Sequence, residues 1–400
     1  MKIVIAAAGS RGDIAPYTGL GVGLSAAGHA VAIATQDEFA PMVHAAGLAH
    51  RPLPADRRPG PGAGPVPGRR ELMRTAARFA AQLARGLPDA VGQGTDLLLL
   101  SATTTPLGPH LTEATGIPAL GVHLQPNAPT RAFPPAVTGV RSLGGPANRA
   151  LGAFALRTVD RIYAPAVRDL RERLGLPRAT GAQARRRSEA AGRPVLHGFS
   201  TALVPRPADW RPELEIVGTW WPHVAEPRLP YTVEEFLASG PRPVLVTFGS
   251  MAAGQGERLS ELVVAALRRA GLRGILQSGA ASLAARADGI LTVGDLPHEL
   301  LMPRVAAVVH HAGAGTAAAA RAGAPSVPVP VTADQPFWAR RLALAGAATE
   351  PIPLRQLTVE RLAHALRETP GLPGPRAIAD RMASEDGVGA VVKAVERLPL

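Results

Sequence analysis

Cysteine is absent from the 400-residue chain, which excludes disulfides, thiolate metal ligands and a cysteine nucleophile. Aromatic residues make up only 4% of the sequence, so few side chains are available to stack nucleic-acid bases. The formal net charge of +12 comes mainly from arginines scattered along the chain, without a helix-turn-helix or zinc-binding pattern. We therefore expect no nucleic-acid partner.

Long apolar runs are also absent. Runs such as 97–100 fall far short of the ~20 residues that cross a bilayer. The first expected strand begins at Lys2, with neither a basic leader nor a small-residue cleavage site before it, which argues against a signal peptide. We expect a cytoplasmic monomer or homodimer without a membrane span.

Short β-rich runs alternate with longer alanine-rich stretches, a pattern typical of parallel strands joined by crossover helices. Strands are expected in the first half near 3–7, 31–35, 97–101, 119–123 and 196–199, and in the second half near 244–248, 274–277, 290–293, 306–310 and 327–331. Because the pattern restarts, and because 400 residues suit two cores better than one, we predict an α/β fold with two domains.

Proline marks the expected boundary between the domains. Four prolines occur between Arg211 and Pro230, around the pair Trp220-Trp221, which looks exposed. We therefore expect a first domain over 1–210, a linker over 211–240, a second domain over 241–375 and a terminal helical segment over 376–400 that packs back across the boundary. The Pro- and Gly-rich segment 57–70 is expected to be a long mobile loop, either an acceptor-binding lid or a plain surface insertion.

A glycine-rich turn at 310–316, His-His-Ala-Gly-Ala-Gly-Thr, follows an apolar run and precedes an alanine-rich helix. Glycines let a backbone approach an anion, and free N–H groups at a helix start point towards it. A histidine can donate to a phosphate oxygen, and Thr316 can add a hydroxyl. Side chains alternate along a strand, so only one of His310 and His311 can serve. The residues alone are equally compatible with packing.

Two carboxylates follow other expected strands. Asp334 and Gln335 place a carboxylate and an amide side by side, which suits the hydroxyls of a sugar, although Asp334 also suits a helix N-cap. Asp13 is a candidate general base, and a helix cap is the alternative that the residues alone favour. The turn around Asp13 lacks the GxGxxG spacing of a dinucleotide fold, which disfavours a nicotinamide enzyme.

Several segments occur in one order: AAAGSRGDIAP at 6–16, LQPNAPTRAFPP at 124–135, VTFGS at 246–250, DLPHELLMPRVAAVVHHAGAGT at 295–316 and DQPFWARR at 334–341. Together they resemble the nucleotide-sugar glycosyltransferases of the GT-B fold, families 1 and 28, in the branch of bacterial natural-product (antibiotic) and sterol glucosyltransferases. The resemblance covers almost the whole chain. It implies two Rossmann-like doubly wound domains that face a cleft.

The same resemblance implies a role for individual residues. It implies Asp13 as the base that deprotonates the acceptor and His311 as the catalytic diphosphate ligand, with His310 structural. The remaining implied contacts are Ser10, Ser250, Gly313, Gly315 and Thr316 for the diphosphate, Val293 and Leu296 for the nucleobase, Asp334 and Gln335 for the donor sugar, and Gln125 and Phe133 for the acceptor. One departure is Ala312, where most close relatives have a second glycine.

The implied reaction is a single inverting displacement that needs neither a metal nor a cofactor. The donor would be a UDP- or dTDP-linked hexose or deoxyhexose, and the acceptor a hydroxyl of a hydrophobic natural product such as a polyketide, macrolide or terpenoid. Two alternatives stay open. A nucleotide-sugar 2-epimerase shares the architecture but would need acidic pairs in the sugar pocket, and a silent auxiliary partner would be expected to lose Asp13 or the His311 turn.

Overall fold

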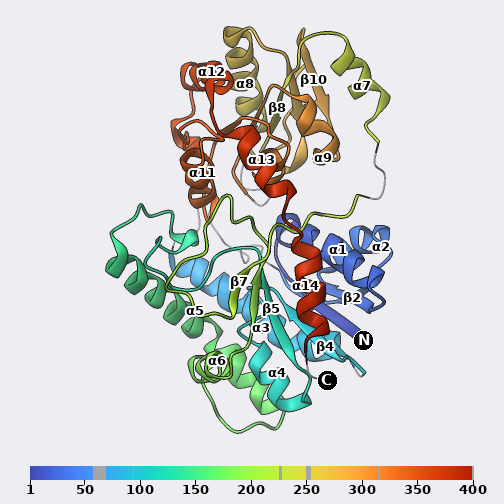
Figure 1. The fold of residues 1–400 in the computed structure, drawn as a ribbon, viewed down its shortest axis with the longest axis vertical. Coiled ribbons are helices and arrows are strands. Elements are labelled where there is room, and N and C mark those ends of the chain that lie inside the picture. Colours follow the sequence, from blue (N-terminus) through green and yellow to red (C-terminus); the bar gives the residue numbers. More distant parts are fainter. Residues whose placement is uncertain (57–68, 93, 225–227, 249–253, 314–315, 399–400) are drawn as a thin grey trace.

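The computed structural model describes residues 1–56, 69–92, 94–224, 228–248, 254–313 and 316–398. The chain forms two parallel sheets, one of seven strands in the order β3-β2-β1-β4-β5-β6-β7 and one of five strands in the order β10-β9-β8-β11-β12. The first sheet lies in the lower half of Figure 1 and the second in the upper half. Helices join the strands of each sheet, so the predicted α/β class with two doubly wound units is confirmed.

The first sheet consists of β1 (Lys2–Ala6), β2 (Ala30–Thr35), β3 (Ala49–Pro52), β4 (Leu97–Leu100), β5 (Ala119–His123), β6 (Val195–His197) and β7 (Leu214–Ile216). Its helices are α1 (Arg11–Ala26), α2 (Ala40–Ala45), α3 (Arg69–Val91), α4 (Gly108–Thr115), α5 (Gly145–Arg173) and α6 (Gly181–Ala190). Neither edge strand of this sheet, β3 or β7, is among the strands expected from the sequence. Strand β7 lies inside the expected linker, and it pairs with β6, so the first domain extends past residue 210.

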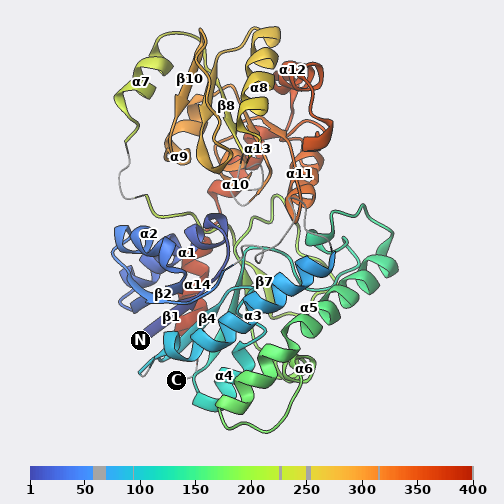
Figure 2. The same ribbon diagram turned by 180° about the vertical axis from the view of Figure 1, so that it is seen from behind.

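Alternating side chains of this sheet enter two separate cores. Val4 and Ala6 of β1 pack with α3 and α5, whereas Ile3 and Ile5 pack with α1 on the opposite face. Figure 2 shows α3 and α5 running side by side across the first of these faces. Because both faces are covered, the central strands are largely apolar, as in Leu97–Leu100.

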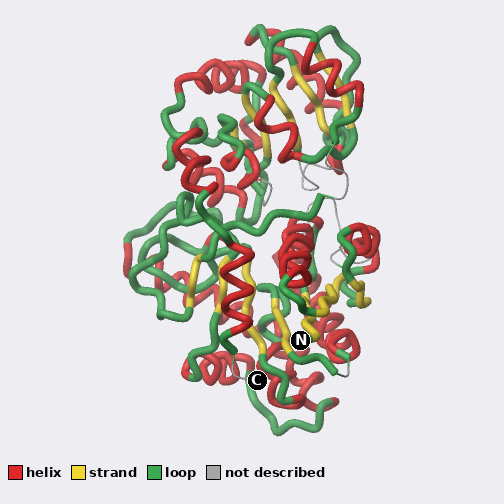
Figure 3. Tube along the Cα trace, turned by 45° about the vertical axis from the view of Figure 1, so that its right-hand side comes forward, coloured by secondary structure: helices red, strands yellow, loops and turns green. Residues whose placement is uncertain are grey.

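The second sheet consists of β8 (Val244–Thr247), β9 (Gly274–Gln277), β10 (Ile290–Val293), β11 (Ala307–His310) and β12 (Ser326–Pro328). The helices of this half are α7 (Tyr231–Ala238), α8 (Gly256–Ala270), α9 (His298–Leu301), α10 (Thr316–Arg321), α11 (Gln335–Leu344), α12 (Val359–Glu368) and α13 (Pro375–Ala383). The last helix, α14 (Gly387–Glu396), returns to the first sheet, where Val391 and Val395 join the core around α1. Figure 3 shows α14 lying over the strands of the lower sheet.

The tryptophan pair between the two sheets differs from the expectation of exposure. Trp220 is only 1% exposed, and its indole Nε1 donates to the carbonyl of Gly387 at 3.0 Å. A Cβ at Gly198 would collide with the indole, so this close approach requires glycine. Trp220 therefore fastens the start of α14 to the first domain. No helix among the described residues is both long and apolar enough to cross a membrane.

Candidate active site

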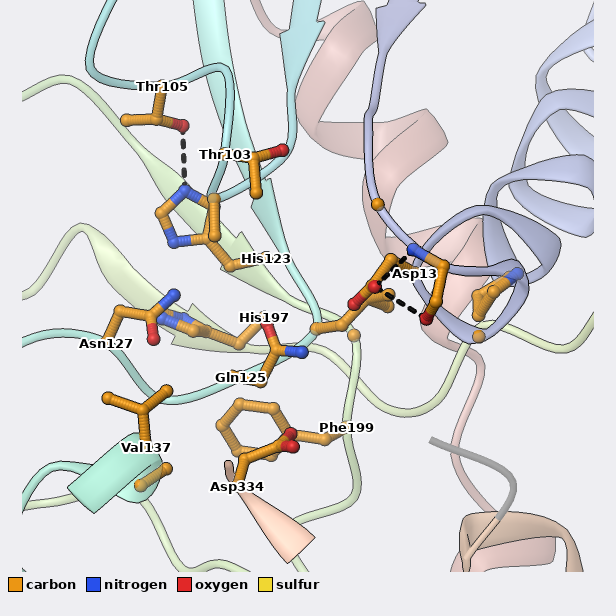
Figure 4. Close-up of a pocket in the computed structure, with 18 of the residues that line it drawn as sticks. Asp13, Thr103, Thr105, His123, Gln125, Asn127, Val137, His197, Phe199 and Asp334 are labelled. Atoms are coloured by element: carbon orange, nitrogen blue, oxygen red, sulfur yellow. Dashed lines mark hydrogen bonds between the residues drawn. The ribbon is translucent and has the colours of Figure 1, made fainter. Parts of the chain in front are cut away.

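The turns that follow the strands of both sheets line a single cleft of about 2390 Å³. A pocket for one small molecule usually measures ~300–1,000 Å³, so this cleft has room for two substrates. Figure 4 shows its first-domain wall, with Asp334 reaching in from the second domain. The expected segment 57–70 lies almost entirely outside the described residues.

Asp13 stands in the first turn of α1 and is half-buried at the cleft. Its Oδ2 atom accepts hydrogen bonds from the backbone N–H and the hydroxyl of Ser10, each at 2.8 Å. Ser10 is the N-cap residue of α1, so Asp13 performs part of the capping role that the residues alone favoured. Both side chains also line the cleft, which leaves a catalytic role open to Asp13.

A buried amide that the sequence analysis missed holds this turn in place. Gln36 follows β2 and is 7% exposed. Its Nε2 donates to the carbonyl of Gly9 at 2.9 Å, and its Oε1 accepts the Gly9 N–H at 3.1 Å. This paired bond fixes the backbone immediately before Ser10. The signal in the sequence that could have identified Gln36 is its position as a polar residue directly after a buried strand.

Asp334 occupies the N-cap position of α11, but its side chain makes no capping bond. Instead, its Oδ2 accepts from the indole Nε1 of Trp338 at 3.0 Å. Burial raises the pKa of Asp334, and the negative charge of Asp13 raises it further, while hydrogen bonds from Trp338 and Gln125 oppose the rise. The negative charge of Asp13 therefore disfavours ionisation of Asp334 on the other side of the cleft.

Gln335 is 5% exposed and uses its side-chain oxygen within the protein. The Oε1 atom accepts the backbone N–H of Val331 at 2.8 Å and of Thr332 at 3.2 Å. These bonds fix the loop after β12. Of the two groups expected to hold a sugar, Asp334 thus offers a carboxylate, and Gln335 offers only its amide nitrogen.

The two histidines at the end of β11 have different surroundings. His310 is 4% exposed, and its Nδ1 accepts the N–H of Ala312 at 3.2 Å, which suits a structural role. His311 lines the cleft, with its Nε2 against Gly313, where a Cβ would collide with it. Burial lowers the pKa of His311, while a hydrogen bond to the backbone of Thr247 raises it, as expected when a ring N–H donates to a carbonyl.

The turn after His311 departs from ordinary backbone geometry. Ala312 has a φ of 60°, a left-handed conformation that favours glycine, which explains why a glycine is expected at this position. Thr316 begins α10. Gly315 and Ser250, two further expected diphosphate contacts, lie outside the described residues.

The two expected nucleobase residues are placed differently. Leu296 lines the cleft, whereas Val293 is not among the described residues that do, and packs into the core of the second sheet. Next to Leu296, Asp295 forms an ion pair with Arg11 of the first domain at 3.3 Å. Both side chains of this pair are largely exposed, so it contributes little to stability.

The two expected acceptor residues also differ. Gln125 lines the cleft. Phe133 is 5% exposed, and its ring packs edge-on against Phe337 of the second domain, 5.2 Å between centroids, with the Arg341 guanidinium 4.9 Å from its ring. It does not line the cleft among the described residues, so we place Phe133 in the contact between domains.

The chain matches two models of known protein families. Residues 3–134 match the model of the glycosyltransferase family 28 N-terminal domain, and residues 275–394 match that of the erythromycin biosynthesis protein CIII-like C-terminal domain. A 6-deoxyallosyltransferase of Streptomyces fradiae, which acts on O-mycaminosyltylonolide, is 36% identical across 97% of this chain and 95% of its own. This chain therefore belongs to the glycosyltransferase family that these two models and this relative represent. It is an enzyme of the hexosyltransferase class.

The glycosyltransferase also resembles more distant proteins. A sterol 3-beta-glucosyltransferase of Arabidopsis thaliana is 30% identical over 98% of this chain and 65% of its own. Among solved structures, the glycotransferase of kitacinnamycin superposes with a TM-score of 0.75 at 19% identity, covering 100% of this chain and 99% of the other. The spinosyn rhamnosyltransferase covers 99% of this chain and 100% of its own at 19% identity, and is known with spinosyn aglycone (TM-score 0.69) and with thymidine diphosphate (TM-score 0.68). These likenesses show the GT-B fold.

Proposed function

We propose that this glycosyltransferase moves a hexose or deoxyhexose from a UDP- or dTDP-sugar to a hydroxyl of a hydrophobic small molecule, with inversion and without a metal. The observation that carries the proposal is that Asp13 of the first domain and Asp334 of the second line the same cleft, where the negative charge of Asp13 raises the pKa of Asp334. A base on the first domain and a hydroxyl-binding carboxylate on the second are the groups that such a transfer requires.

Asp13 is the proposed base. It removes the proton of the acceptor hydroxyl while that oxygen attacks the anomeric carbon, and the bond from this carbon to the diphosphate oxygen breaks on the opposite side. The two bonds from Ser10 and the clamp of Gln36 on Gly9 hold the Asp13 turn rigidly, which supports this assignment. Inversion follows from a single displacement.

His311 is the proposed partner of the departing diphosphate. One ring N–H serves the backbone of Thr247, so the other nitrogen carries a hydrogen only when the ring is protonated. A protonated ring would add a positive charge as well as a donor, and this compensates the growing charge on the leaving group without a metal. Backbone at Gly313 lies beside it, and Ser10, Ser250, Gly315 and Thr316 remain proposed contacts.

The acceptor side of the cleft supports a hydrophobic substrate. Leu72, Val137 and Val159 line it, and they are 56%, 58% and 37% exposed. An apolar aglycone would cover them. The names of the relatives point the same way, because a macrolide and a sterol are both large apolar alcohols.

Incubation with labelled UDP- and dTDP-sugars and a panel of polyketide, macrolide and terpenoid alcohols tests the proposal. We expect transfer to an alcohol, or slow donor hydrolysis, with activity unchanged by EDTA and a product of inverted anomeric configuration by NMR. An isomerised donor would instead indicate an epimerase, and no turnover with any donor would indicate an auxiliary protein. A thermal-shift comparison of UDP with dTDP then identifies the nucleotide, because a ligand of the native state raises the Tm.

A further inference from the structure

A small group of polar side chains lines the first-domain wall of the cleft. His123 ends β5, is 8% exposed and lines the cleft, and the half-buried Asn127 shortly after it lines the cleft as well. Figure 4 shows both on the same side of the cavity as His197, with Val137 and Phe199 nearby. None of these three polar residues was singled out from the sequence, and the proposed transfer does not use them.

The hydrogen bonds around His123 fix which ring nitrogen carries the hydrogen. Its Nε2 lies 2.9 Å from the hydroxyl of Thr105. The single hydroxyl hydrogen of Thr105 is directed to a carbonyl, that of Ser101 at 2.9 Å, so Thr105 can only accept from the ring. Nε2 therefore donates, and Nδ1 keeps a lone pair. No group among the described residues bonds to this Nδ1, so a hydrogen-bond acceptor faces the cleft unused.

His197 adds a second lone pair to the same wall. Its Nδ1 donates to the carbonyl of Glu215 at 2.9 Å, which leaves Nε2 as an acceptor. That Nε2 is buried and has no partner within the described part of the chain. The ring lies edge-on to His123, with 5.7 Å between centroids, and stacks on Trp210. The lone pair of His123 is therefore open to a donor from the cleft, whereas that of His197 is covered by the protein.

We propose that His123 binds a second hydroxyl of the acceptor molecule, distinct from the hydroxyl that receives the sugar. This inference rests on the proposed function, because it assigns the first hydroxyl to Asp13. The ligand hydroxyl donates to Nδ1 of His123, and the side-chain amide of Asn127, which has no bond to another described residue, supplies a donor in return. His123 is thus a specificity-determining residue.

The topology sets the separation of the two hydroxyls. Strand β4 lies between β1, which leads to Asp13, and β5, which ends at His123. Two spacings between neighbouring strands amount to roughly 10 Å. The favoured acceptors are therefore molecules that carry two hydroxyls at a comparable separation.

His123 is unsuited to act as a second base. Burial lowers its pKa to about 3, with the neighbouring His197 adding to the effect. The ring is therefore neutral at neutral pH and a weak proton acceptor, but its lone pair still accepts a hydrogen bond. This supports a role in recognition.

Binding of two steroids tests the proposal. Androstanediol carries a hydroxyl at each end of a rigid skeleton, and androstanol keeps only one. We expect the wild-type protein to bind the diol about tenfold more tightly by titration calorimetry, the usual worth of one hydrogen bond in an apolar site. His123→Phe keeps an aromatic ring without nitrogen and should bind both steroids equally. His123→Asn places an amide near the position of Nδ1 and should restore part of the preference.

Two results would overturn the proposal: no preference for the diol in the wild-type protein, including failure to bind either steroid, or an undiminished preference in His123→Phe. If His123→Phe does not fold, as judged by cooperative unfolding, the Thr105→Val variant replaces it, because loss of the fixed tautomer should reduce the preference. The Tm shift caused by UDP or dTDP should be the same in every variant. Absence of both nucleotide shift and sugar transfer would instead reject the proposed function, whatever the steroids show.

Discussion

The carboxylate of Asp13 accepts the backbone N–H and the hydroxyl of Ser10 with the same oxygen, Oδ2, each at 2.8 Å (Figure 4). One residue therefore closes the first turn of α1 and faces the substrate cleft. The structural and the proposed catalytic duty can be separated by mutation, since an amide oxygen can still accept both bonds but cannot take a proton from an alcohol.

Asp13→Asn should reduce turnover by ~10²-fold or more, because a positioned general base contributes about that much, while UDP or dTDP affinity stays nearly constant. Steady-state kinetics and thermal shift measure the two quantities. Asp13→Ala is the matched control: it should lose the same activity and also ~1 kcal/mol of unfolding free energy with the capping bonds. Full turnover in Asp13→Asn would mean that another base acts.

Donor binding should weaken in acid at a higher pH than an ordinary aspartate would allow. Burial and Asp13 raise the pKa of Asp334, so its carboxylate is protonated, and loses acceptor capacity, as pH falls through that raised value. The pH profile of nucleotide-sugar affinity measures this midpoint. In Asp13→Asn, removal of the neighbouring charge should move the midpoint to lower pH. An unmoved midpoint would show that the two carboxylates are not coupled.

Binding of UDP or dTDP should be accompanied by uptake of up to about one proton near neutral pH. Burial lowers the pKa of His311 in the free enzyme, and a diphosphate beside the ring would raise it again. Calorimetry in buffers of different ionisation enthalpy measures the uptake as a change in apparent binding enthalpy. His311→Gln keeps a donor that does not titrate, so its binding enthalpy should be independent of the buffer. Buffer-independent binding in the wild type would contradict the role given to His311.

The folded protein should lose stability between pH ~6.5 and ~4. Burial holds the pKa of four histidines low, at about 4 for His110 and His197 and about 3 for His123 and His310. In the unfolded chain each has a pKa of ~6.5, so on acidification the unfolded state binds protons first. Each group then costs about 1.4 kcal/mol per pH unit until its folded pKa is reached.

Urea unfolding at several pH values measures this loss. His110→Gln should flatten the dependence, since it removes one titrating group, although Arg171 then loses its contact with the His110 ring at 2.9 Å. An unfolding free energy that stays constant from neutral pH down to about pH 5 would be incompatible with neutral buried rings.

Two alanines with left-handed backbone offer a matched pair of glycine substitutions. Ala333 (φ 57°) is exposed, and Ala312 (φ 60°) is fully buried. Ala333→Gly should raise the unfolding free energy by about 1 kcal/mol, because glycine adopts this conformation without steric cost. Ala312→Gly should gain less, since it also removes a buried methyl worth ~0.8 kcal/mol. Thermal unfolding distinguishes them, and a loss of stability in Ala333→Gly would refute the argument.

The ten strands expected from apolar periodicity are all present, because buried parallel strands are apolar on both faces and therefore conspicuous. The two missed strands are edges. In β3, the central residues His50 and Arg51 are polar and half-exposed, and β7 is only three residues long, in a proline-rich segment. Such strands are defined by the neighbour they pair with, which composition does not reveal.

Candidate site residues could be predicted from the sequence where they lie in a motif that the resembled family shares. They could not be predicted where only the packing of distant segments brings a residue to the cleft. Two motifs of this kind contain Asp13 and His311, and both residues line the cleft. The burial of Trp220 is not visible in the sequence, because its indole packs against Gly198, which follows β6 about twenty residues earlier in the chain. His123 and Gln36 follow ordinary apolar strands, and only the fold shows that these positions open on the cleft. Phe133 lay within a matching segment, but contacts Phe337 instead of the cleft.

The return of α14 to the first domain constrains how this enzyme can be recombined with its relatives. A chimera that exchanges the donor half for another sugar specificity cannot be joined by one cut in the proline-rich segment after β7. The foreign half would end in a helix shaped for another α1, and the core around α1 would lose Val391 and Val395. A workable exchange keeps residues from Gly387 onwards with the acceptor half, so the donor module is inserted between two junctions rather than appended at one.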